Sequence, residues 1–267
     1  MRLLLAVALT AAQLPLEPMK DAGLGVTAAY EGWFKSPDGS VRLLIGYFNR
    51  NLKQTLDIPI GPENRIEPGE PDQGQPTHFL PRRQWGVFTI VVPKDFGDKK
   101  LTWTLVANGQ TTSIPMGLNP QYEVEPYRDA AQGNTPPVIR FAKDSVALQG
   151  PPRGMASTLS GIVGQPVDLT LWASDDAVVD ALRKPGESPV TIKWTKYRGP
   201  GEVTFSDAEP KVEKGDGRAT ATATFSVPGD YILRAQANDV SGEGGGGFQC
   251  CWTNAHVKVT VTGSSVR

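Results

Sequence analysis

The chain has 267 residues, with 27 basic and 28 acidic side chains and a formal net charge of −1. This balance excludes the strong positive field by which proteins gather nucleic acid. The length suits two domains of ordinary size, and 39% hydrophobic with 21% charged residues indicates a globular chain. The 29 glycines and 23 prolines favour strands and turns over helices.

The first predicted element is an export signal at the N-terminus. Arg2 supplies a positive charge, residues 3–9 form an apolar run, and small residues follow at Ala11 and Ala12. A run of this length is too short for a helix to cross a bilayer of about 30 Å. We therefore expect a signal peptide over residues 1–12, a secreted, periplasmic or cell-surface protein, and no transmembrane segment in the mature chain. A buried strand or a retained anchor is the alternative.

Residues 25–122 hold short apolar segments between turn signals, which predict a first β-sandwich. Asn108-Gly109 is a strong hairpin signal, because both residues tolerate the left-handed backbone of a two-residue turn. Residues 61–84 contain five prolines and almost no periodicity, so we expect a long Pro-rich loop there. Such loops often carry binding sites, and the alternative is a connector that covers a sheet edge.

A polar linker over residues 123–137 leads to residues 138–263, which predict a second β-sandwich. Apolar and polar residues alternate through 167–171 and again through 257–261. A period of two indicates antiparallel sheets, each with one face on the core and the other in water.

This second half resembles a known family. The segment PGDYILRAQANDVSG (228–242), followed by a closing Val-x-Val-x-Val strand, is similar to the end of a bacterial immunoglobulin-like domain of the PKD (polycystic kidney disease) type. LWASDD (171–176) resembles a middle strand of that family, and Trp194 falls where such sandwiches place a core aromatic residue. The resemblance implies a binding, adhesive or spacer module of a secreted or surface protein. The first half resembles fibronectin-like or other immunoglobulin-like sandwiches more loosely.

Cys250 and Cys251 are the two cysteines of the chain and are adjacent. Adjacent Cα atoms lie about 3.8 Å apart, below the roughly 4.4–6.8 Å of ordinary disulfides. The pair therefore predicts a strained vicinal disulfide, an intermolecular bond, or a metal or cofactor site; unpaired buried thiols are the remaining alternative. A metal site would need His256 and perhaps His78, but the spacing does not match that of zinc ligands.

Four glycines precede this pair: Gly244, Gly245, Gly246 and Gly247. No helix signal or Lys-Ser/Thr follows them, as a phosphate-binding loop requires. We expect the tip of a hairpin that is either mobile or held by a partner.

Three aspartates, Asp175, Asp176 and Asp239, form a candidate calcium site. The resemblance implies that their strands end at one pole of the sandwich. Asp180 or Glu243 and backbone carbonyls would complete the six to eight oxygen ligands of Ca²⁺. The alternative is a set of solvated turn aspartates.

A basic and aromatic cluster lies at the end of the Pro-rich loop. Arginine beside aromatic rings can bind a carboxylate, a sugar face or a partner protein. The alternative is the start of a strand with core aromatics and solvated arginines. The cluster consists of His78, Phe79, Arg82, Arg83 and Trp85.

The sequence contains no GxSxG or HExxH motif that would indicate catalysis. We predict an exported all-β protein of two tandem immunoglobulin-like antiparallel β-sandwiches, non-catalytic and without a cofactor, with calcium as the alternative. It would dock to other protein subunits of a surface, filament or membrane assembly through strand edges, the Pro-rich loop and the Gly-rich hairpin. The alternatives are a carbohydrate- or ligand-binding accessory module and, after that, a metal-binding protein or enzyme.

Overall fold

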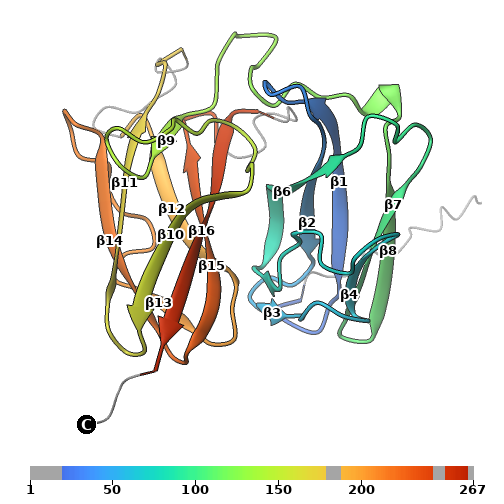
Figure 1. Ribbon diagram of the computed structural model, residues 1–267, viewed down its shortest axis with the longest axis horizontal. Coiled ribbons are helices and arrows are strands. Elements are labelled where there is room, and N and C mark those ends of the chain that lie inside the picture. Colours follow the sequence, from blue (N-terminus) through green and yellow to red (C-terminus); the bar gives the residue numbers. More distant parts are fainter. Residues whose placement is uncertain (1–19, 179–187, 243–249, 264–267) are drawn as a thin grey trace, which may run out of the picture.

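The computed structural model describes residues 20–178, 188–242 and 250–263, which form two β-sandwiches side by side (Figure 1). The predicted all-β fold class is confirmed, since one short 3-10 helix, η1 (Pro120–Tyr122), is the sole helix of the described part. Within these ranges there is no helix with the length and apolarity needed to span a membrane. The predicted signal peptide, Asp180, Glu243 and Gly244 to Gly247 lie outside the described residues.

The first sandwich has two three-stranded sheets and a short two-stranded ladder around one core. Two antiparallel sheets that pack over one core form a β-sandwich, the architecture that immunoglobulin-like domains share. Phe88 and Trp103 meet edge to face across the core, with ring centroids 5.2 Å apart. The orders are β1 (Val26–Lys35), β2 (Val41–Asn49), β6 (Arg82–Val92); β4 (Asn64–Glu67), β7 (Leu101–Ala107), β8 (Gln110–Met116); and β3 (Leu56–Asp57), β5 (His78–Phe79).

The hairpin predicted at Asn108-Gly109 is confirmed. Ala107 pairs with Gln110, so the turn has two residues, and their φ angles of 49° and 73° are the positive values that a type I′ turn requires.

The prediction that residues 61–84 form a continuous loop is wrong. Strand β4 lies inside this segment and pairs with β7, β5 pairs with β3, and β6 begins at Arg82. Strands of four and two residues, separated by prolines, are too short to show a period of two. The remaining loop, residues 68–77, runs between β4 and β5.

The second sandwich consists of two four-stranded sheets. With β9 and β10 taken as two parts of strand A, and β11 to β16 as strands B to G, one sheet contains C, F and G and the other contains A, B, E and D. This is the arrangement of immunoglobulin domains. One pairing differs from the prediction of purely antiparallel sheets: β10 runs parallel to β16. The orders are β10 (Met155–Ile162), β16 (Trp252–Thr262), β15 (Gly229–Asn238), β12 (Thr191–Arg198); and β13 (Val203–Phe205), β14 (Arg218–Phe225), β11 (Val167–Ser174), β9 (Val138–Arg140).

Two aromatic residues mark the immunoglobulin-like character of this core. Trp194 is buried on β12, the C strand, as predicted. Tyr231, near the start of β15, donates its Oη hydrogen to the Val227 carbonyl at 2.8 Å. This contact is the tyrosine corner found at the start of strand F in immunoglobulin domains. The finer PKD type stays a prediction.

The outer face of the sheet β10-β16-β15-β12 is not the wet face that the alternation predicts. His256 and Arg234 point away from the core valines of β16, yet they are 5% and 3% exposed. The first sandwich covers them, with β6 lying closest to this sheet (Figure 1). The polar residues at alternate positions therefore form a second buried surface, which lies between the sandwiches.

Candidate functional site: the interface between the sandwiches

The sandwich interface joins β12, β15 and β16 of the second sandwich to β6 and residues 71–78 of the first. It contains two histidine side chains, His78 and His256, and the buried arginine Arg234.

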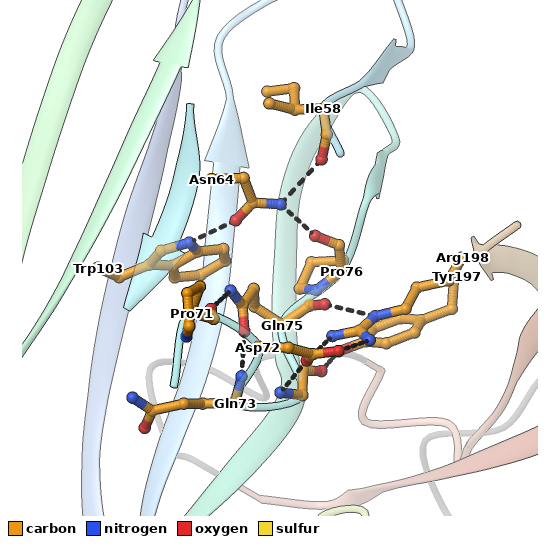
Figure 2. Close-up of polar contacts among 11 residues, drawn as sticks. Ile58, Asn64, Pro71, Asp72, Gln73, Gln75, Pro76, Trp103, Tyr197 and Arg198 are labelled. Atoms are coloured by element: carbon orange, nitrogen blue, oxygen red, sulfur yellow. Dashed lines mark hydrogen bonds and ion pairs between the residues drawn. The ribbon is translucent and has the colours of Figure 1, made fainter. Parts of the chain in front are cut away.

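Arg198, at the end of β12, clamps the loop before β5 (Figure 2). Its guanidinium holds both carboxylate oxygens of Asp72, at 2.8 and 2.9 Å, and its Nε donates to the Gln75 carbonyl at 2.7 Å. This hydrogen bonding is the main reason that the pKa of Asp72 lies below its usual value. Tyr197 donates from its hydroxyl to the Gly74 carbonyl. A two-point Arg–carboxylate contact fixes orientation as well as position.

Two fully buried amides hold the same loop against the first sandwich. Asn64 donates to the carbonyls of Ile58 and Pro76, at 2.9 and 2.8 Å, and accepts from Trp103 Nε1 at 3.0 Å (Figure 2). Gln75 donates to the Pro71 carbonyl at 2.7 Å. The prolines of this loop have no N–H for a sheet ladder, so these amide side chains satisfy carbonyls that strand partners would otherwise satisfy.

His256 occupies the middle of the interface. Its ring lies 4.2 Å from the Tyr197 ring, centroid to centroid, and its Nε2 donates to the Val87 carbonyl of β6 at 3.1 Å. Burial, aided by the positive charge of Arg234, lowers the pKa of His256 to about 3. The ring is therefore neutral at ordinary pH and acts as a hydrogen-bond donor between the sandwiches.

Arg234 makes the next contact along β15. It donates to Asn254 Oδ1 at 2.8 Å, to Gln84 Oε1 at 3.1 Å and to the Trp85 carbonyl at 3.3 Å. Asn254 in turn donates to the Gly86 carbonyl at 2.9 Å. One buried cation thus links two strands of the second sandwich to β6 of the first.

The predicted basic and aromatic cluster is divided by the fold. Arg83 stacks over Trp85 at 3.9 Å and pairs with the buried carboxylate of Glu31 at 2.7 Å. Phe79 is fully buried in the first core, so its predicted contact with a ligand is wrong: it points inward from β5. Arg82 is the exposed member of the cluster.

His78 lies beside Asp57 and Lys196, where β3 and β5 meet β12. Its Nδ1 is 2.8 Å from Asp57 Oδ1, which also accepts from Lys196 Nζ at 3.1 Å. Burial lowers the pKa of His78, although the carboxylate of Asp57 opposes the change. The group joins β3 and β5 to β12, and ligand binding by His78 stays a prediction.

Gly86 of β6 packs closely against Trp252 of the second sandwich. Its φ is 50°, and a Cβ there would lie 2.9 Å from Trp252 Nε1. We expect Gly86→Ala to lower the free energy of unfolding by about 2 kcal/mol, from left-handed backbone strain and displacement of the Trp252 ring. Urea unfolding measures the change. The matched control is Gly109→Ala, whose φ of 73° is similar but whose Cβ meets nothing within 4 Å; an equal loss in both variants would contradict the close contact.

The adjacent cysteines are joined to each other. Cys250 and Cys251 form a vicinal disulfide with a Cα–Cα separation of 3.2 Å, and both residues are buried just before β16. Cys251 Sγ lies 3.4 Å from the Asn134 carbonyl of the linker. Among the described residues no three His, Cys, Asp or Glu side chains are grouped as a metal site would require. The structure does not assemble the alternative site of Cys250, Cys251 and His256.

Each of the three candidate calcium ligands accepts a hydrogen bond from a different residue. Asp239 accepts from Asn134 Nδ2 at 2.7 Å, Asp176 accepts from the Thr135 hydroxyl at 2.8 Å, and Asp175 accepts from the Ala177 amide at 3.0 Å. In the part of the chain that the structure describes they do not form a group of three. Calcium binding stays a prediction.

One cavity was not predicted from the sequence. It has a volume of about 790 Å³ and lies beside β1, β8 and η1 of the first sandwich. Tyr30 and Tyr122 line it, with their rings edge to face at 5.8 Å, and Tyr30 donates to the Gly117 carbonyl at 2.6 Å. Burial raises the pKa of Tyr30. Residues from strands far apart in the chain form this cavity, so no single sequence motif predicts it.

No protein-family model and no curated protein matches the chain. Among solved structures, the S-layer protein SbsC domains 4 and 5 are 12% identical with a TM-score of 0.26, over 62% of this chain and 66% of that chain. The D00-D0 domain of intimin is 12% identical with a TM-score of 0.29, over 89% and 99%. The Yersinia pseudotuberculosis adhesin InvE is 12% identical with a TM-score of 0.25, over 88% and 58%. The chain thus spans just under two thirds of the SbsC fragment. At such TM-scores the immunoglobulin-like assignment rests on the strand orders and the tyrosine corner of the second sandwich.

Proposed function

We propose that the chain is an exported, non-catalytic structural subunit that docks to other proteins of a surface, filament or membrane assembly. The sandwich interface is the observation that carries this proposal. His256 and Arg234, which could otherwise serve a reaction or a ligand, are hydrogen-bonded within it, and Arg83 is paired with Glu31 inside the first sandwich. Tandem domains with small, polar contacts normally move relative to each other. Here buried side chains connect them, so the outer strand edges keep a fixed orientation, as an assembly subunit requires.

Cell fractionation tests this function directly. We expect a C-terminally tagged chain to be found outside the cytoplasm and, after crosslinking of intact cells, in species larger than the monomer. The Arg234→Ala variant, with the interface weakened, should show a smaller crosslinked fraction than Arg153→Ala, which changes an exposed arginine. A cytoplasmic chain, or an exported chain that crosslinks to nothing, would contradict the proposal.

A ligand-binding accessory module is the second candidate function. The cavity between Tyr30 and Tyr122 favours it, because paired aromatic rings beside a concave surface suit a sugar or another flat ligand. Arg82, Arg83 and Trp85 remain the other candidate ligand surface of this second function, with Arg83 stacked over Trp85.

A further inference from the structure

Strand β10 is an edge strand with one neighbour. It is the first strand in the order β10-β16-β15-β12, so one side of its backbone has no strand partner in the described structure (Figure 1). Its eight residues, MASTLSGI, include no charged residue and no proline. An edge of this kind is a template for another strand.

The other edge strands of the described sheets carry the features that normally prevent such pairing. Strand β12, at the opposite edge of the same sheet, has Lys193, Lys196 and Arg198. Strands β9 and β13 have three residues each, β3 and β5 have two each, and β8 contains Pro115. In the first sandwich β4 is short and charged, β1 contains Glu31 and Lys35, and β6 faces the sandwich interface. Length, charge and proline protect these edges, and β10 has none of these protections.

Two exposed apolar side chains lie at the two ends of β10. Met155 is 50% and Ile162 is 48% exposed. They are an odd number of positions apart, which would normally place them on opposite faces. The register shift between Met155 and Ser157 removes this difference, because Met155 pairs with His256 and Ile162 with Thr262, both on the outer face of β16. Both apolar side chains therefore lie on one face of the sheet.

We propose that β10 pairs with β10 of a second copy of the chain, antiparallel and about a two-fold axis. In such a pair the start of one strand lies opposite the end of the other. Met155 of each copy then approaches Ile162 of the other on the shared face, so that each exposed apolar side chain is covered. Because the strand is uncharged, two copies do not repel each other along it. The inference rests on the proposed function, since it names the first partner that docks to the subunit.

Sedimentation of the purified full chain tests this pairing. An eight-residue edge buries little area, so we expect a weak dimer that appears between about 1 μM and about 1 mM. Thr158 and Ser160 are exposed on β10, and Thr158→Lys with Ser160→Lys places like charges across the two-fold axis. We expect the dissociation constant to rise at least about ten-fold. If the double variant is unstable, Thr158→Lys alone replaces it in this test. Its thermal midpoint is compared with that of the unaltered chain to show that it is folded.

The matched control is Thr220→Lys, an exposed threonine on β14 inside the other sheet, which should dimerise like the unaltered chain. A monomer at every concentration, or a dimer that the β10 lysines do not weaken, would overturn the pairing. A photo-crosslinker at position 160 in cells separates this inference from the proposed function. Capture of a second copy supports it, whereas capture of a different protein overturns it and leaves the docking function standing.

Discussion

Arg234→Ala is expected to lower the free energy of unfolding by about 3 kcal/mol and to separate the unfolding of the two sandwiches. The substitution removes a buried donor and leaves Asn254 Oδ1, Gln84 Oε1 and the Trp85 carbonyl without it. Buried acceptors that lose a charged donor cost more than the net value of the hydrogen bonds. Because these acceptors lie on both sandwiches, the variant should also lose the coupling between them. Calorimetry would show one transition becoming two.

Two further variants separate hydrogen bonding from packing and from general surface effects. Arg234→Met keeps the apolar stem of the side chain, and we expect it to lose nearly as much as Arg234→Ala, since the acceptors are still left unpaired. Arg153→Ala alters an exposed arginine of the same sandwich and should change little. If Arg234→Met unfolded like the unaltered chain, the polar contacts would not be what couples the sandwiches.

Strands were predicted from the sequence where apolar and polar residues alternate along most of the strand. The segments 167–171 and 257–261 place apolar residues inward as expected, because one face of each strand meets a core. Strand β4 escaped prediction because four residues between prolines show too little periodicity. The parallel pairing of β10 escaped too, because local patterning does not specify which neighbour a strand chooses.

The sandwich interface could not be predicted for a different physical reason. Arg234, Asn254 and His256 are polar residues at alternate positions, which is also the pattern of a face in water. Alternation separates the core face from the other face but does not reveal whether the latter meets solvent or a second polar surface. In the cluster at residues 78–85 the Trp85 carbonyl accepts from Arg234 of the second sandwich, whereas Arg83 stacks on Trp85 of its own strand, and ligand binding by the cluster stays a prediction. Its aromatic and basic composition was the available signal.

Acid should weaken the folded chain through His256. In the unfolded chain this histidine has a pKa of about 6.5, whereas burial lowers the pKa in the folded chain to about 3. Between these values the unfolded chain binds a proton that the folded chain does not. The free energy of unfolding therefore falls as the pH drops below about 6.5, by about 1.4 kcal/mol per pH unit and about 2.7 kcal/mol at pH 4.5. Urea unfolding at a series of pH values measures this slope.

His256→Gln isolates this contribution, because the amide can still donate toward the Val87 carbonyl but does not titrate. We expect a flatter profile from pH 6.5 to 4.5, whatever the stability of the variant at pH 7. His78→Gln is the matched control, and it should flatten the profile less, since Asp57 favours the charged form of His78 and opposes burial. No carboxylate of the described residues plays this part for His256. The positive charges of Arg234 and Arg198 instead lower its pKa, because they disfavour protonation of the ring. If His256→Gln and the unaltered chain gave parallel profiles, His256 would take up protons equally in both states, and its ring could not be the buried neutral donor that joins the sandwiches.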